Sequence, residues 1–142
     1  MEQKIRIFPL HDDEDDFYKF KIEISNHNCS IISEFYGYSD VFNDFSNKLI
    51  GFPKSISDEI IFEIGEDSKT WAYHFLFKVL CYEANGNSAI HIKISNNKEF
   101  ADVENSEFVI KTKPASLNKL GKSLNEWNPY NNKEFIWIAE NI

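Results

Sequence analysis

The chain has 142 residues, a length that suits a single domain (residues 1–142) with a core of its own. Hydrophobic residues make up 42% and aromatic residues 15%, so the apolar surface can offset chain entropy, and general disorder is excluded. The formal net charge is −8, which disfavours contact with a phosphate backbone. We therefore expect a folded domain that does not bind nucleic acid.

The acidity is concentrated in one predicted loop, residues 11–16. Five of the eight net negative charges lie there in one run, namely Asp12, Asp13, Glu14, Asp15 and Asp16. Such a run steers a basic partner toward itself. Three interpretations stay open: a solvated loop, a partner-facing patch, and a cation site. The run lacks the Asp-x-Asp-x-Asp-Gly order and the later Glu of an EF-hand.

The absence of a recognisable targeting signal and the contexts of the two cysteines indicate an intracellular setting. The first residues lead into a short strand and not into the apolar segment of a signal peptide. No stretch approaches the roughly 20 apolar residues of a membrane-spanning helix. Cys29 and Cys81 form no CxxC pair and lie in strand-like contexts, so we interpret both as buried small hydrophobic residues. We expect a cytoplasmic protein without membrane contact.

The first third of the sequence alternates apolar and polar residues, as strands with one buried face do. Residues 4–8 predict a short strand that stops at Pro9. Residues 18–24 and 29–36 predict two further strands, joined by turn-forming residues 25–28. These two strands should form a hairpin.

The period then changes to that of a helix. Apolar residues recur at spacings of three and four, at Val41, Phe42, Phe45 and Leu49. Ser39 is a candidate N-cap, and Gly51 is placed to end the helix. The spacing predicts an amphipathic helix over residues 40–50.

Strand periodicity returns in the middle of the chain. Residues 60–64 predict one strand, and residues 71–82 predict a long strand that is apolar on both faces, as a central strand is. The turn 85–87 then predicts a hairpin with residues 89–94.

The last third of the chain predicts a strand at 108–110 and then a helix that follows Lys113-Pro114. Ser116 is the candidate cap of this helix. Its apolar residues at helical spacing are Leu117, Leu120, Leu124 and Trp127. Gly121 lowers the helix propensity by about 1 kcal/mol relative to Ala. Residues 135–139, within the tail 128–142, suit a terminal strand. The predicted fold is α+β, with an antiparallel sheet of about six or seven strands and two helices packed on one face.

Motifs of catalysis or metal binding are missing. The four histidines have no metal-binding spacing, and they are His11, His27, His74 and His91. His74 and His91 should lie several residues apart, because a hairpin turn near residue 86 is not centred between them. No nucleophile motif or phosphate-binding loop occurs. The many carboxylates leave a glycosidase-like acid pair open on residue types alone. We expect a protein that is not an enzyme and uses no metal or cofactor.

Four aromatic residues flank the two predicted helices: Tyr36 and Tyr38 precede the first, and Trp127 and Tyr130 stand at the end of the second. Exposed aromatic side chains near carboxylates are typical of interface hot spots. The margin of an ordinary core has the same composition, so both interpretations stay open.

From Phe20 to about Trp127, the layout resembles a family of bacterial immunity proteins, the antidotes of polymorphic or contact-dependent toxins, of the type paired with WapI toxins. The resemblance is carried by the hairpin 18–36, the helical phrase from Tyr38 to Leu49, the strand 60–64, the hairpin 71–94, and the closing strand and helix that end in Leu124-Asn125-Glu126-Trp127. The turn 85–87 lacks the family's glycine-rich acidic character, and the tail 128–142 is additional. These departures leave the cognate toxin open.

The resemblance implies a rigid protein with a surface complementary to one toxin and no chemistry of its own. The toxin would be basic, for example a nuclease, and would be blocked at its active site or substrate groove. The candidate partner-binding residues are the acidic run 12–16, Tyr36 and Tyr38. The alternative is a small enzyme or ligand-binding domain with a concave sheet face lined by Trp71, Tyr73 or His74. A third hypothesis, a subunit of a larger assembly, predicts an extensive exposed apolar patch.

Overall fold

The computed structural model describes residues 1–11 and 16–142. Its elements are, in chain order, β1 (Lys4–His11), β2 (Phe17–Ser25), β3 (Ser30–Tyr38), α1 (Asn43–Leu49), β4 (Glu59–Gly65), β5 (His74–Cys81), β6 (Ser88–Ser95), the 3-10 helix η1 (Phe100–Asp102), β7 (Asn105–Thr112), α2 (Pro114–Glu126) and β8 (Phe135–Ile138). This order of strands and α-helices is the one that the sequence periods predict, including the terminal strand.

The eight strands of the described residues form two antiparallel sheets of four strands each. Sheet A has the order β3-β2-β1-β8, and sheet B has the order β4-β5-β6-β7. The predicted α+β class is confirmed, but the prediction of a single sheet with about six or seven strands is wrong. The break falls at α1, because β4 pairs with β5 and leaves β3 as an edge of sheet A. The chain returns to sheet A only with β8, which pairs with β1.

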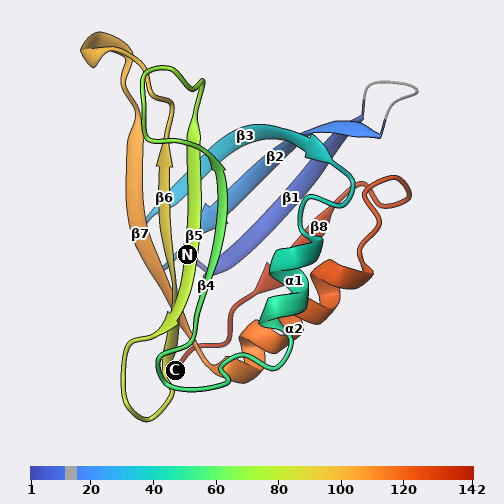
Figure 1. Ribbon diagram of the computed structural model, residues 1–142, viewed down its shortest axis with the longest axis vertical. Coiled ribbons are helices and arrows are strands. Elements are labelled where there is room, and N and C mark those ends of the chain that lie inside the picture. Colours follow the sequence, from blue (N-terminus) through green and yellow to red (C-terminus); the bar gives the residue numbers. More distant parts are fainter. Residues whose placement is uncertain (12–15) are drawn as a thin grey trace.

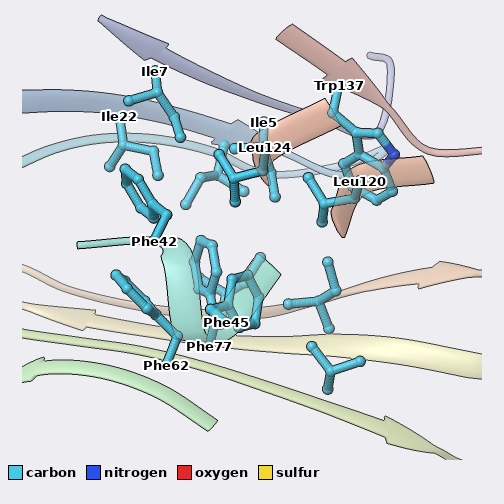
Figure 2. Close-up of a cluster of buried hydrophobic side chains, with 14 of the residues drawn as sticks. Ile5, Ile7, Ile22, Phe42, Phe45, Phe62, Phe77, Leu120, Leu124 and Trp137 are labelled. Carbon is cyan, nitrogen blue, oxygen red and sulfur yellow. The ribbon is translucent and has the colours of Figure 1, made fainter. Parts of the chain in front are cut away.

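The two sheets face one another, and both helices lie at the open side between them (Figure 1). Figure 2 shows side chains of sheet A, such as Ile7 and Ile22, pointing toward Phe62 and Phe77 of sheet B. Phe45 of α1 lies between the two groups. The helices therefore contribute to a core shared by two sheets, and do not cover one face of a single sheet.

Aromatic rings connect the two sheets directly. The ring of Phe35 in β3 lies 5.1 Å from the ring of Phe75 in β5 and 6.1 Å from that of Phe62 in β4, measured between centroids. All three side chains are buried. A fully buried side chain of this size contributes about 1.5–3 kcal/mol relative to an exposed one. Packing across the inner faces thus holds the sheets together.

A buried amide makes a second connection between the sheets. The side chain of Gln3, just before β1, lies against the edge strand β7 of sheet B. Its Nε2 donates to the carbonyl oxygen of Lys111 at 2.9 Å, and its Oε1 accepts from the backbone N–H of Lys111 at 3.3 Å. The side chain therefore replaces a strand backbone at this edge and satisfies buried polar groups that would otherwise destabilise the fold.

The start of α1 differs from the prediction. The helix begins at Asn43 with Phe42 at the N-cap position and without a side-chain cap. Ser39 precedes it in a turn, and its Oγ donates to the carboxylate of Asp16 instead. The predicted end is confirmed, because α1 ends at Leu49 and Gly51 follows with a φ of +84°.

The predicted cap of α2 is also wrong. The helix begins one turn earlier than a Ser116 cap requires, with Pro114 in its first turn and Lys113 at the N-cap position. Proline suits the first turn of a helix, because a backbone N–H at that position has no acceptor within the helix and its loss costs no hydrogen bond. Ser116 is buried inside the helix, where its Oγ accepts a hydrogen bond from the backbone N–H of Glu140.

The limits of β1, β5 and β7 differ most from those that the sequence predicts. β1 continues past Pro9, which pairs with Phe20 of β2. Proline is tolerated there because β8 pairs only with residues 4–7, so that Pro9 has a strand on one side alone. β5 begins at His74, after the predicted start at Trp71, and β7 is longer than the predicted 108–110.

The two cysteines lie in different surroundings. Cys81 is half-buried, whereas Cys29 is exposed, and both thiols are free. The prediction that both are buried is wrong for Cys29, because it lies in the turn between β2 and β3, and holds only in part for the half-buried Cys81.

Candidate protein-binding surface

The outer face of sheet A carries exposed aromatic side chains at one end. Alternation along β2 turns Tyr18, Phe20 and Ile22 into the core, so Phe17 and Lys19 point outward. The register of β2 with β3 places Tyr38 opposite Phe17 and Tyr36 opposite Lys19. Four residues from two strands therefore share one corner of this face.

Three of these residues form an aromatic cluster, defined here as Phe17, Tyr36 and Tyr38. The rings of Phe17 and Tyr36 are stacked, with centroids 5.7 Å apart and planes 7° apart. The rings of Phe17 and Tyr38 meet edge-to-face at 5.1 Å. The cluster stays accessible, since the exposed fractions of Phe17, Tyr36 and Tyr38 are 41%, 49% and 60%. Mutual ring contacts thus order side chains that no core covers.

Lys19 and Glu34 fix the border of the aromatic cluster. Their Nζ and Oε2 atoms lie 2.7 Å apart, and the same Nζ lies 6.0 Å from the centroid of the Tyr36 ring. The hydrogen bond that Lys19 donates to Glu34, together with the negative charge of Glu34, raises the pKa of Lys19 above the ordinary value. Lys19 therefore remains charged at neutral pH and is engaged with Glu34 and Tyr36.

Two hydrogen bonds hold β3 in place behind the aromatic cluster. The backbone N–H of Tyr36 donates to the hydroxyl of Tyr73, which belongs to the connection between β4 and β5 in sheet B. At the end of β3, Ser39 donates to Asp16 at 2.8 Å. Both bonds join segments that are distant in sequence, so the edge strand under the cluster is tied to its surroundings.

The structure brings together part of the predicted site. Tyr36 and Tyr38 are exposed and belong to the aromatic cluster, as a partner-binding role requires. Asp16 lies at the same end of β3 through its bond with Ser39. The predicted residues Asp12, Asp13, Glu14 and Asp15 lie outside the described residues.

Sequence reasoning missed Phe17. The sequence predicts that the strand starts at Tyr18, although Phe17 continues the alternation on the face of Lys19. Of the other two candidate aromatics, Tyr130 is exposed, whereas Trp127 packs against the core. Trp127 thus belongs to the core margin.

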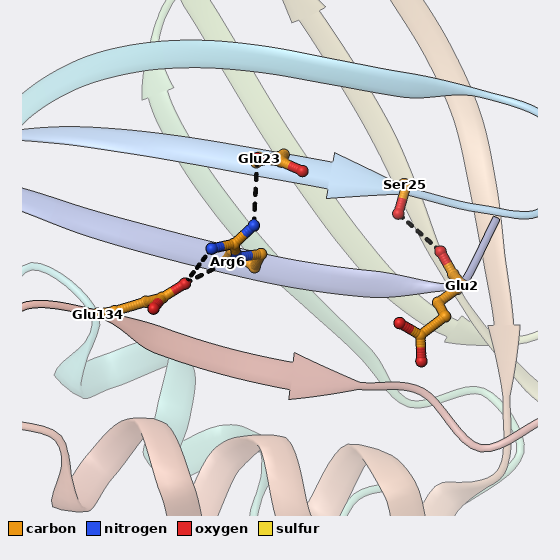
Figure 3. A network of polar contacts seen from close by, with 5 residues as sticks. All are labelled: Glu2, Arg6, Glu23, Ser25 and Glu134. Carbon is orange, nitrogen blue, oxygen red and sulfur yellow. Dashed lines mark hydrogen bonds and ion pairs between the residues drawn. The ribbon is translucent and has the colours of Figure 1, made fainter.

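Farther along the same face, Arg6 organises an ion-pair network (Figure 3). Its Nε donates to Glu134 Oε1 at 2.8 Å, and its Nη1 lies 3.8 Å from Glu23 Oε2. Its guanidinium carbon lies 4.9 Å from the centroid of the Phe8 ring. Because Arg6 of β1 contacts both Glu134, just before β8, and Glu23 of β2, we interpret this network as a connection between β8, β1 and β2.

One cleft that could hold a small molecule lies on the outer face of sheet B. His74 is almost fully buried there, and its Nε2 lies 2.7 Å from Glu63 Oε2. His74 lines an open cleft of about 290 Å³ together with Lys93 and Glu107. Trp71 lies outside the cleft in an exposed loop. Of the three residues of the concave-face alternative, His74 lines this cleft, and Trp71 and Tyr73 do not.

The prediction that His74 and His91 do not face one another across the hairpin is confirmed. His91 lies opposite Lys78 and binds Glu107, with 2.6 Å between Nε2 and Oε2. His74 lies opposite Ser95, so the two histidines are not paired across the hairpin. Within residues 1–11 and 16–142, no three His, Cys, Asp or Glu side chains are grouped so that they could hold a metal ion.

Comparisons of the chain with protein-family models, with curated proteins and with solved structures gave no match. Among the helices that the structure describes, none has the length and apolar character needed to cross a membrane.

Proposed function

We propose that this chain is a non-catalytic binding protein of the cytoplasm that acts as an immunity protein and neutralises a cognate bacterial toxin by direct contact. The observation that carries the proposal is the aromatic cluster on the outer face of sheet A. Its three rings are exposed and lie on paired strands, with Phe17 stacked on Tyr36 and edge-to-face with Tyr38.

Such a surface suits tight binding to a protein. Tyrosine is enriched among the residues that dominate interface energetics, because its ring buries a large area and its hydroxyl can still form a hydrogen bond. Order before binding also reduces the entropy lost on association. The ring contacts within the cluster and the hydrogen bond from Tyr36 to Tyr73 supply this order.

The charge around the aromatic cluster favours a basic partner. Asp16 lies beside the end of β3, and the sequence places four more carboxylates immediately before it, at residues 12–15. Acidic groups near an interface raise the association rate with a basic protein and disfavour acidic ones. A basic toxin domain, for example a nuclease that binds nucleic acid, has the complementary charge.

The proposal is tested with the toxin domain encoded beside this gene. We expect the purified domain to bind the chain, and co-expression of the two to restore growth of a bacterial host that the toxin alone arrests. Tyr36→Ala and Tyr38→Ala should each raise the dissociation constant by at least about tenfold, measured by calorimetry. Ile61→Ala is the matched control, because Ile61 is similarly exposed but lies on sheet B.

Two results would contradict the proposal. One is that no toxin domain is encoded beside the gene, or that the encoded domain does not bind. The other is binding that both tyrosine variants leave unchanged, which would move the interface away from the aromatic cluster.

A second candidate function, a small ligand-binding domain or enzyme, is favoured by the cleft at His74. A buried histidine oriented by Glu63 can exchange a proton with a ligand, and Lys93 adds a positive charge at the cleft wall. A thermal-shift screen of small metabolites tests this candidate. Stabilisation that is lost in His74→Gln would support it, and a screen without any stabilising compound would count against it.

A further inference from the structure

The loop between β6 and β7 carries the most exposed large hydrophobic side chain among the described residues. Phe100, at the start of η1, is 93% exposed. In Figure 1 this loop lies at the upper left, away from the end of β3 that carries the aromatic cluster. Phe100 therefore belongs to a different surface from the one proposed above.

The loop is built around the side chain of Asn96. Asn96 Oδ1 accepts from the backbone N–H of Glu104 at 2.9 Å, and Asn96 Nδ2 donates to the carbonyl oxygen of Asp102 at 3.0 Å. The backbone N–H of Asn96 also donates to the carbonyl oxygen of Glu104 at 3.1 Å. These bonds close the base of the loop and hold η1 at its tip, so Phe100 is displayed by an ordered turn.

A neighbouring loop, between β4 and β5, is tied to this one. Asn97 Nδ2 donates to the carbonyl oxygens of Glu66 and Trp71, at 2.7 Å and 3.2 Å. Lys69 Nζ donates to the carbonyl oxygen of Lys98. Because Trp71 is also exposed, at 48%, two aromatic side chains project from a pair of mutually braced loops. We call these two loop segments, residues 66–71 and 96–104, the aromatic loop pair.

Carboxylates dominate the charge of the aromatic loop pair. The pair contains Glu66, Asp67, Glu99, Asp102 and Glu104, against only Lys69 and Lys98. Lys69 is itself engaged, since its Nζ also lies 4.0 Å from Glu99 Oε2. An acidic rim around an aromatic tip repels an anionic lipid surface, and it also repels the same surface on a second copy of the chain.

From this combination we propose that the aromatic loop pair is a second docking surface, on which Phe100 inserts into an apolar pocket rimmed by Lys or Arg side chains on a partner protein. Burial of the ring supplies affinity, and the carboxylates select the basic rim. The proposal stands independently of the toxin-binding function, because it uses other residues and requires only this partner chemistry.

The test uses a library of disulfide-constrained peptides selected on the immobilised full chain. We expect one enriched class of peptides to combine aromatic or aliphatic residues with Lys or Arg. Phe100→Ala should raise its dissociation constant at least about tenfold, which corresponds to about 1.4 kcal/mol. Asn96→Ala keeps the ring but releases the base of the loop, so we expect it to weaken binding as well. Ile32→Ala is the matched control and should leave the affinity unchanged, because Ile32 is exposed but lies on β3, outside both proposed surfaces.

Phe100→Ala should fold normally, because the ring is almost fully exposed, and its circular dichroism and melting temperature check this. The proposal is overturned if no enriched peptide class depends on Phe100, or if the dependent class is acidic. Sedimentation velocity and vesicle flotation provide two further checks. Dimerisation that Phe100→Ala abolishes would show that the occupant is a second copy of the chain. Binding to vesicles of phosphatidylcholine and phosphatidylglycerol that requires Phe100 would show that the occupant is a lipid surface. Either result would overturn the proposal of a basic protein partner.

Discussion

Gly121 of α2 lies directly against Leu49 of α1. A Cβ atom added at Gly121 would come within 2.6 Å of the Leu49 Cβ and within 2.7 Å of the Ser46 carbonyl oxygen. The two helices therefore approach so closely that position 121 has no room for a side chain. The residue that lowers the propensity of α2 in isolation is the one that permits its packing in the folded protein.

Gly121→Ala tests this contact. Alanine favours a helix by about 1 kcal/mol over glycine, but overpacking a buried contact costs about 1–3 kcal/mol. We expect a net loss in the free energy of unfolding, because one of the opposing atoms belongs to the backbone of α1. Urea denaturation measures it, with Lys122→Ala as the exposed control in the same helix. A stabilised Gly121→Ala variant would show that α1 can shift without cost.

Asn118 joins the same two helices through hydrogen bonds. Its Nδ2 donates to the carbonyl oxygens of Leu49 and Phe52, at 3.0 Å and 2.9 Å, and so satisfies acceptors at the end of α1. We expect Asn118→Ala to lower the free energy of unfolding by about 1–3 kcal/mol. Asn118→Asp has nearly the same shape but lacks the donor, so it should be at least as unstable at neutral pH. An Asp variant as stable as the native chain would rule out this role.

The acidic run should act mainly on the rate of association with the toxin domain. Replacing residues 12–15 by Asn and Gln removes four negative charges, and we expect a slower association rate with a smaller dependence on salt. The dissociation rate should change little. Surface plasmon resonance between about 50 mM and about 300 mM salt separates the two rates. A change confined to the dissociation rate would place these residues in direct contact with the partner and not in a steering role.

Alkaline pH should weaken the fold through Tyr18. Burial, with smaller contributions from the charges of Asp16 and Tyr130, raises the pKa of Tyr18 above its ordinary value of 10.0. The folded state therefore holds the phenol proton more tightly than the unfolded state. Its contribution to stability is complete below the ordinary pKa and is lost as the pH rises through the folded pKa.

We expect the free energy of unfolding to fall more steeply for the native chain than for Tyr18→Phe between about pH 9 and about pH 11. Urea titrations at each pH measure the two slopes. Because Lys and the other Tyr residues titrate in both proteins, only the difference between the slopes reports on Tyr18. Equal slopes would contradict the prediction.

Tyr36 and Tyr38 show how far a candidate site can be found from sequence. Both stand out as aromatic residues next to the predicted first helix, and the structure confirms that both are exposed, on the outer face of β3. Their neighbour Phe17 was not identified, because its contacts with them depend on the register of β2 and β3. Phe100 was also missed, since a single Phe in a polar loop carries no period, and its exposure results from the hydrogen bonds of Asn96.

The sequence by itself determined the order of strands and helices, because the spacing of apolar residues follows the geometry of each element. Local hydrogen-bond chemistry was less predictable, as Ser39 and Ser116 bind distant partners and cap no helix. Tertiary structure alone decided that the strands divide into two sheets. The pairing of β8 with β1 and the contact of Gln3 with β7 join residues from opposite ends of the chain, and no local pattern encodes such contacts. The same non-local packing decided which aromatic side chains stay exposed.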